Sequence, residues 1–168
     1  NLKNWQRIKE LKWAYLYSNM LSDVAKNAVA LYMVELLYKC LKQPEANPDL
    51  FYFCEDAFLE RDNCTNEITA NFPIYFSMQL AYFLGFRLHD NYSIENNMFN
   101  PGEGNFSDKN LEQCYFIKND ISSHISKLLK ARPPLNLKEI KLNKNIRKTI
   151  LTVVEDNYGL HIHKLEIS

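Results

Sequence analysis

The stretch formed by residues 23–41, DVAKNAVALYMVELLYKCL, constrains the fold more than any other part of the chain. From Ala28 to Tyr38 only Glu35 is charged, whereas a surface helix normally carries polar residues along one side. The length of the stretch and its Ala, Leu and Met content favour a helix over a strand. We therefore expect a central helix that is buried on several faces and on which the other helices pack.

The lone acid of this stretch has a simple structural interpretation. Glu35 stands four residues before Lys39, a spacing that supports a salt bridge on a helix, and a neighbouring basic group is the other possible partner. No histidine or second acid stands at a spacing that would make Glu35 a general acid or base. We expect no catalytic role for it.

Four further helices and one irregular insertion follow from capping residues and apolar periodicity. Pro73 is tolerated in the first turn of one of these helices, and Gly85 ends that helix. The segment 87–107 is rich in Asn, Gly and Asp, and it predicts a compact loop with a short hairpin that turns at residues 101–104. The helices are expected at about 48–62, 71–84, 120–130 and 143–158. The predicted fold class is mainly α: a single helical-bundle domain with a central buried helix and a short loop or hairpin insertion.

Length and composition indicate one globular domain. The chain has 168 residues, of which 46% are hydrophobic, which is enough for a proper core. No run of about 18 uncharged apolar residues exists, so we expect no membrane partner. The opening NLKNWQRIKE has neither Met nor an apolar secretory core, and it leads us to interpret the chain as part of a longer protein.

The four cysteines, at positions 40, 54, 64 and 114, form no CxxC pair. A zinc site is therefore not expected, and the cysteines fit a reducing compartment, which predicts a cytoplasmic protein. Neither a nucleophile–base pair nor a phosphate-binding glycine loop is apparent, so the prediction is a protein that is not an enzyme and that uses no cofactor and no metal.

Charge is unevenly distributed although the formal net charge is zero. Residues 42–67 hold seven acids against two bases, and residues 109–148 hold ten bases against three acids. The basic segment is either a footprint for a polyanion or an ordinary solvated helix face. Five residues that fall near one stripe if the segment is helical are candidate nucleic-acid contacts: Lys138, Lys141, Lys144, Arg147 and Lys148.

The expected helix at 71–84, NFPIYFSMQLAYFL, has no charged residue and many aromatic ones. Most of these rings should belong to the core. A surplus could line a groove that binds a partner peptide between this helix and the one at 23–41. The candidate groove residues are Phe72, Tyr75 and Phe76.

Four stretches, taken in this order and spacing, resemble the helical C-terminal domain of the RecO family of bacterial DNA repair and recombination mediators, and most closely its Bacteroidetes-type members. KNAVALYMVELLYKCL is similar to the family's K-x-A-x-A-x-F-x-x-E-x-L helix. The other three are NPDLFYFCEDAF, NFPIYFSMQLAYFLGF and NIRKTILTVVEDNYGLHI. The opening WQRIKELKWAY resembles the linker from the family's N-terminal OB domain. The resemblance thus implies a linker at residues 1–20, from an OB domain that is absent here, and the helical domain at residues 21–168.

The resemblance also implies a function. Members bind single- and double-stranded DNA, anneal complementary strands, engage the acidic, aromatic-ended tail of the single-stranded-DNA-binding protein, and load the recombinase RecA together with RecR. The runner-up hypothesis is a protein-interaction lobe with no DNA contact of its own. Many members hold zinc with four cysteines after Leu-Gly-Phe, but the segment 87–106 of this chain has none, so no zinc is expected there.

Overall fold

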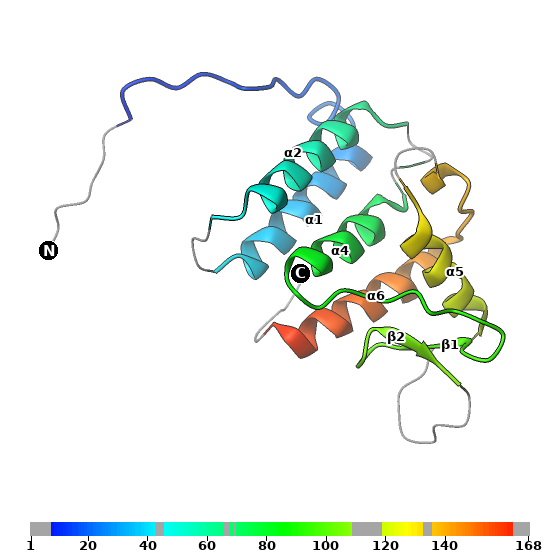
Figure 1. The fold of residues 1–168 in the computed structure, drawn as a ribbon. Helices are drawn as coiled ribbons and strands as arrows, with labels where there is room; N and C mark the ends of the chain where they lie inside the picture. Colours follow the sequence, from blue (N-terminus) through cyan, green and yellow to red (C-terminus); the bar gives the residue numbers. More distant parts are fainter. Residues whose placement is uncertain are drawn as a thin grey trace, which may run out of the picture.

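The computed structural model describes residues 8–42, 46–65, 68, 70–108, 119–132 and 136–162. Helices α1 (Val24–Cys40) and α2 (Pro48–Asn63) lie side by side at one end of the molecule, and α5 (Asn119–Lys130) and α6 (Lys144–His161) lie at the other (Figure 1). Helix α4 (Phe72–Phe83) runs between the two pairs. The mainly helical fold is therefore confirmed, and each of these helices lies within three residues of its predicted bounds.

The predicted hairpin is present and short. Strand β1 (Met98–Asn100) pairs antiparallel with β2 (Asn105–Ser107), with Phe99 opposite Phe106. Gly104 in the turn has a φ of +65°, a conformation that favours glycine, and a Cβ there would stand 3.0 Å from Leu88 Cδ2. Both Phe rings of the hairpin are buried, so the insertion is part of the core.

The central helix is α4, and the expectation that the helix at 23–41 holds this place is wrong. Helix α4 packs against α1, α2, α5 and α6. Its buried residues cover most of its circumference, whereas α1 leaves Leu31 63% exposed and Tyr38 82% exposed. Helix α4 carries no charged residue, whereas α1 carries Lys26, Glu35 and Lys39, so this difference in charge was a signal that could have identified α4 as the central helix. The residues of α4 that are buried are Phe72, Ile74, Phe76, Ser77, Met78, Leu80 and Ala81.

Buried hydroxyl groups connect α4 to its neighbours. Ser77 on α4 accepts a hydrogen bond at its backbone oxygen from the Tyr158 hydroxyl of α6, at 2.7 Å. The Ser77 hydroxyl lies 2.9 Å from the Tyr32 hydroxyl of α1. Burial raises the pKa of both Tyr32 and Tyr158 well above the ordinary range, so both hydroxyls stay protonated.

The carboxylate of Asp62 anchors the segment that precedes α1. Asp62 is fully buried at the end of α2. It accepts hydrogen bonds from the backbone N–H groups of Met20 at 2.6 Å, Asn19 at 2.9 Å and Ser18 at 3.1 Å. Lys26 of α1 donates to the backbone oxygen of Asp62 at 2.7 Å. One residue thus fixes where the chain enters the helical bundle.

The predicted helix ends are confirmed in part: the expected cap Asn71 forms no side-chain hydrogen bond to the first turn of α4, and the last helix is longer than expected. Asp23 caps α1, Asn47 caps α2 and Asn143 caps α6 through their side-chain oxygens. Gly85 has a φ of +87° after α4, as a helix-ending glycine requires. The last helix runs past its expected end at residue 158 and through Gly159 to His161, where the imidazole stacks on the Phe86 ring at 4.8 Å.

We predict that Phe76→Ala lowers the free energy of unfolding by about 3–5 kcal/mol, because the side chain is fully buried on the central helix. Urea denaturation followed by circular dichroism measures the change. Tyr82→Ala on the same helix, where the ring is 52% exposed, is the matched control and should cost much less. Equal losses in the two variants would contradict the central position of α4.

We also predict that Asp62→Asn lowers the free energy of unfolding by about 1–3 kcal/mol near neutral pH, because the amide keeps only one of the two acceptor oxygens and none of the charge that hold the N–H groups of residues 18–20. Burial raises the pKa of Asp62, but the N–H groups of residues 18–20 outweigh it and hold that pKa below its usual value. The stabilisation is therefore present above about pH 4 and disappears as the pH falls through the folded-state pKa.

Thermal unfolding of wild type and Asp62→Asn between neutral pH and about pH 3 measures this effect. The two stabilities should converge in acid. Asp56→Asn, an exposed acid on the same helix, is the control. A constant difference at every pH would show that the carboxylate charge does not stabilise the segment.

Candidate nucleic-acid interface

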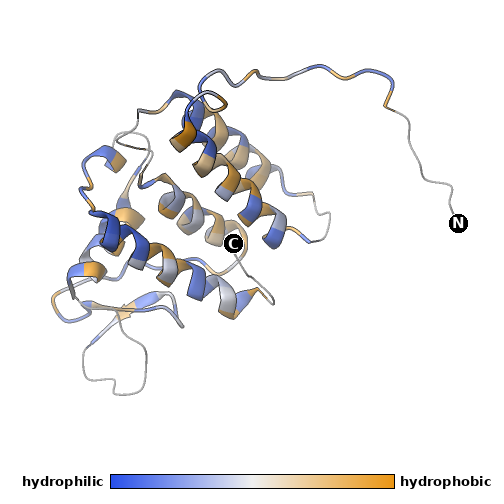
Figure 2. Cartoon of the chain, turned by 180° about the vertical axis from the view of Figure 1, so that it is seen from behind, coloured by the Kyte–Doolittle hydropathy of each residue, from blue (hydrophilic) through white to orange (hydrophobic). Residues whose placement is uncertain are grey.

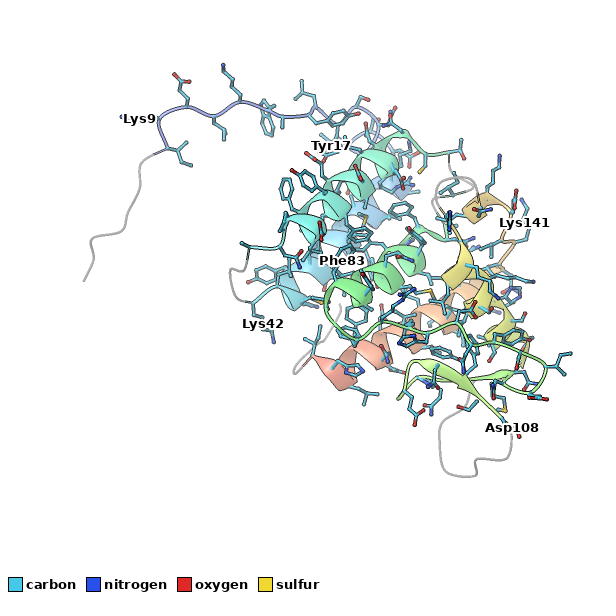
Figure 3. The ribbon with its side chains drawn as sticks, in the orientation of Figure 1. Lys9, Tyr17, Lys42, Phe83, Asp108 and Lys141 are labelled. Atoms are coloured by element: carbon cyan, nitrogen blue, oxygen red, sulfur yellow. The ribbon has the colours of Figure 1, made fainter. Side chains whose placement is uncertain are left out.

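Two adjoining hollows lie where α5, the following connector and the start of α6 meet. One, of about 480 Å³, is lined by residues of α5 and of the connector, and the other, of about 450 Å³, by the connector, the start of α6 and the residues just before α4. Ile140 and Lys141 line both. Figure 3 shows Lys141 on the side of the molecule opposite Lys42, which follows α1.

We call the cations that line these hollows the basic surface. They come from segments far apart in the sequence: Lys127, Lys130, Lys138, Lys141 and Arg147. The three predicted contacts among them are Lys138, Lys141 and Arg147, and they line one hollow together. The structure thus gathers part of the predicted set and adds two lysines of α5, which the positive charge of residues 109–148 could have indicated.

The expectation of a single helical stripe is wrong. The short 3-10 helix η1 ends at Lys138, and α6 begins at Lys144, so Lys141 stands on irregular backbone between them. This connector folds back because Asn71 donates to the backbone oxygens of Ile140 at 2.8 Å and Leu137 at 3.3 Å. Lys144 and Lys148 are exposed one turn apart on α6 and are not among the residues that line the two hollows.

The electrostatics of the surface favour anions. Arg147 donates to the backbone oxygen of Leu142, which fixes its guanidinium beside the first turn of α6. That turn carries the positive end of the helix dipole. Lys130 forms a salt bridge with Asp90 at 3.0 Å, and Glu139 is the acid among the residues that line the hollows.

His124 lies in the floor of the larger hollow. Burial, aided by the charge of Lys127, lowers its pKa below the usual histidine value, so the imidazole is neutral at pH 7. Its Nδ1 is buried and has no hydrogen-bond partner among the described residues. At neutral pH the positive charge of the surface therefore comes from lysine and arginine.

Among the described residues, those that line the two hollows include no Phe, Tyr or Trp. Proteins that hold single strands by their bases use such rings for stacking. The basic surface is therefore suited to phosphate groups, which position a nucleic acid without reading its sequence.

Two of the three candidate groove residues belong to the core. Phe72 and Phe76 are both 0% exposed, so their rings are core and cannot contact a peptide. Tyr75 is half-buried, and burial raises its pKa to about 12. Helices α1 and α4 pack directly against each other, and a groove that involves Tyr75 stays a prediction.

Metal and membrane sites can be addressed only for the residues that the structure describes. Within that part of the chain, no group of three or more His, Cys, Asp or Glu side chains could hold a metal ion. No helix there combines the length and the apolarity needed to cross a bilayer. The absence of zinc and of a cofactor stays a prediction.

Comparison with known proteins gives consistent matches. The chain is 25% identical over 167 residues to a DNA repair protein RecO from Azobacteroides pseudotrichonymphae, and 27% identical over 173 residues to one from Phocaeicola vulgatus. Each match covers 96% of this chain and 66% of the relative. A RecO from Bacteroides fragilis is 35% identical over 79 residues, which cover 47% of this chain and 32% of that protein. No match was found among the solved structures.

The chain therefore spans about two thirds of the length of the first two relatives. A family model described as "Recombination protein O C terminal" matches residues 21–167. That match covers the whole helical bundle, including both hollows of the basic surface. The chain belongs to the recombination protein O (RecO) family, as the sequence resemblance predicted.

Proposed function

We propose that this chain is the helical lobe of a DNA repair and recombination mediator that is not an enzyme, and that the lobe binds the phosphate backbone of single- and double-stranded DNA. The observation that carries the proposal is the basic surface, where cations from α5, the connector and α6 line adjoining hollows. Family membership supports it, because the relatives are named as DNA repair proteins.

The wider activity rests on the family. In the whole protein, this lobe would follow an N-terminal OB domain through the linker at residues 1–20. The protein would work in the cytoplasm, anneal complementary strands, and load the recombinase with RecR. A surface that contacts phosphates without stacking on bases suits annealing, because the bases stay available for pairing.

We predict that Lys138→Gln combined with Lys141→Gln weakens DNA binding and reduces its salt dependence. Each lost phosphate contact lowers the slope of log affinity against log salt by about 0.7 on single strands and about 0.9 on duplex. Fluorescence anisotropy with a labelled oligonucleotide, single-stranded or duplex, between about 50 and 200 mM salt measures both effects.

The matched control is Lys9→Gln combined with Lys12→Gln. It removes the same charge from two exposed lysines outside the basic surface. If the affinity for DNA does not change with salt concentration, the basic surface does not contact phosphates. The same conclusion follows if the two double variants lose equal DNA affinity.

A second candidate is a protein-interaction lobe that binds the acidic, aromatic-ended tail of the single-stranded-DNA-binding protein. The specific observation in its favour is that Ala131, Ile140 and Leu142 line the same hollows as the lysines. Apolar side chains framed by cations fit a peptide that has both acidic and aromatic residues.

We predict that a synthetic acidic peptide with aromatic residues at its end displaces DNA from the basic surface. Ile140→Ser should weaken peptide binding several-fold, because it removes an apolar contact with the aromatic ring of the peptide. The same substitution should leave DNA affinity nearly unchanged. Competition anisotropy measures both. If the peptide binds and DNA does not, the lobe acts through protein contacts alone; if the peptide fails to compete, its site lies elsewhere.

A further inference from the structure

The outer face of α1 carries an apolar seam that no other described residues cover. Its positions are spaced by alternating steps of three and four residues: Val24, Asn27, Leu31, Val34, Tyr38 and Leu41. The large apolar ones are well exposed, at 86% for Val24, 63% for Leu31, 52% for Val34 and 82% for Tyr38. Figure 2 shows α1 from this side of the molecule, with much of its ribbon coloured as hydrophobic.

The spacing specifies the kind of partner. Alternating steps of three and four are the seam along which two α-helices pack knobs into holes. The exposed neighbours Ala25 and Ala28 are small and allow a close approach. Glu35 and Lys39 lie at the edge of the seam and neutralise each other in a salt bridge of 2.5 Å. A helix laid lengthwise on α1 would therefore bury no unpaired charge.

We propose that the seam pairs with the same seam of a second copy of this chain, with the two α1 helices antiparallel. The sequence is complementary to itself in this orientation. A two-fold axis between Tyr32 and Met33 places Leu31 against Val34 and Val24 against Leu41. The same axis places Asn27, an amide, against the Tyr38 hydroxyl.

The charges at the two ends of the seam are complementary as well. The axis brings Asp23, which caps α1, opposite Lys42, which follows its last turn. A parallel pair would instead place Asp23 beside Asp23 and Lys42 beside Lys42. Like charges directly opposite each other disfavour that arrangement.

An apolar hollow adds area to this interface. It has a volume of about 880 Å³ and lies where α1 ends, α2 begins and α4 ends. Leu41 belongs to both the seam and the hollow. The apolar residues that line the hollow include Leu37, Leu41, Leu50, Phe51, Phe83 and Leu84.

The segment of residues 8–16, which we call the strap, is the natural occupant of the partner's hollow. It is extended, and it leaves the bundle next to the start of α1 (Figures 1 and 3). Ile8, Leu11, Trp13 and Leu16 on the strap are 72–81% exposed. Because the helices are antiparallel, the start of one α1 lies beside the end of the other. Each strap then begins on the side of the second copy where the hollow lies, and its exposed apolar side chains would add to the seam.

The test is the oligomeric state of the 168-residue chain. Sedimentation equilibrium from about 1 μM to 1 mM should show a reversible dimer. Leu31→Glu, at an exposed position that should not disturb folding, is expected to raise the dissociation constant at least tenfold. Ile94→Glu is the matched control, because Ile94 is 95% exposed and lies outside the seam. Circular dichroism verifies that both variants fold.

Mixing variants tests the orientation. Leu31→Glu and Val34→Lys should each be monomeric alone and should dimerise when mixed, because these two positions face each other only in the antiparallel pair. A mixture of Leu31→Glu with Leu31→Lys should stay monomeric. If that second mixture dimerises instead, the pair is parallel and the proposal is wrong.

Trp13→Ser tests the strap, and it should raise the dissociation constant several-fold; no change would remove the strap from the interface. A chain that is monomeric at every concentration overturns the proposal. The seam would then belong to a helix of another protein or to a part of the longer protein outside this chain. A dimer that Leu31→Glu and Ile94→Glu weaken equally would overturn it too. None of these measurements involves DNA, so they are independent of the proposed function.

Discussion

The burial of α4 is the constraint on which the rest of the structure depends. A helix without charge and with large apolar residues around most of its circumference cannot face water without a high cost. Here α1 and α2 cover it from one side, and α5 and α6 cover it from the other. The hairpin completes the core with two buried Phe rings. The surfaces of functional interest, the basic surface and the seam, lie on the outer layers that this helix holds together.

Much of the fold could be predicted from sequence because its signals are local. Capping residues such as Asp23 and Asn143, and the glycine after α4, fix helix ends through groups only a few residues apart. The hairpin turn followed in the same way from Pro and Gly at residues 101–104. The order of burial was not predicted, because the long apolar run of α1 was given more weight than the complete lack of charge in α4. Only the packed structure shows that no other described element covers the exposed side of α1.

The candidate site, like the fold, could be predicted from the sequence only in part. The excess of positive charge in residues 109–148 indicated an anion-binding region, and three of the five predicted cations do line one hollow. The candidates do not share one helical stripe, because Lys138 and Lys141 lie before α6, in η1 and on the connector that Asn71 holds. The contribution of Lys127 and Lys130 depends on how α5 lies beside that connector, which no local pattern encodes. For the aromatic residues, pattern alone could not separate core from groove, and burial assigned Phe72 and Phe76 to the core.

The position of the basic surface has a consequence for valency. It lies on the α5–α6 side of α4, whereas the seam lies on the α1 side (Figure 1). Two copies joined back to back along α1 would therefore turn their cationic faces outward, in opposite directions. Such a particle is bivalent: a strand held by one face is tethered to whatever the other face holds, which raises the local concentration of the second strand around the first.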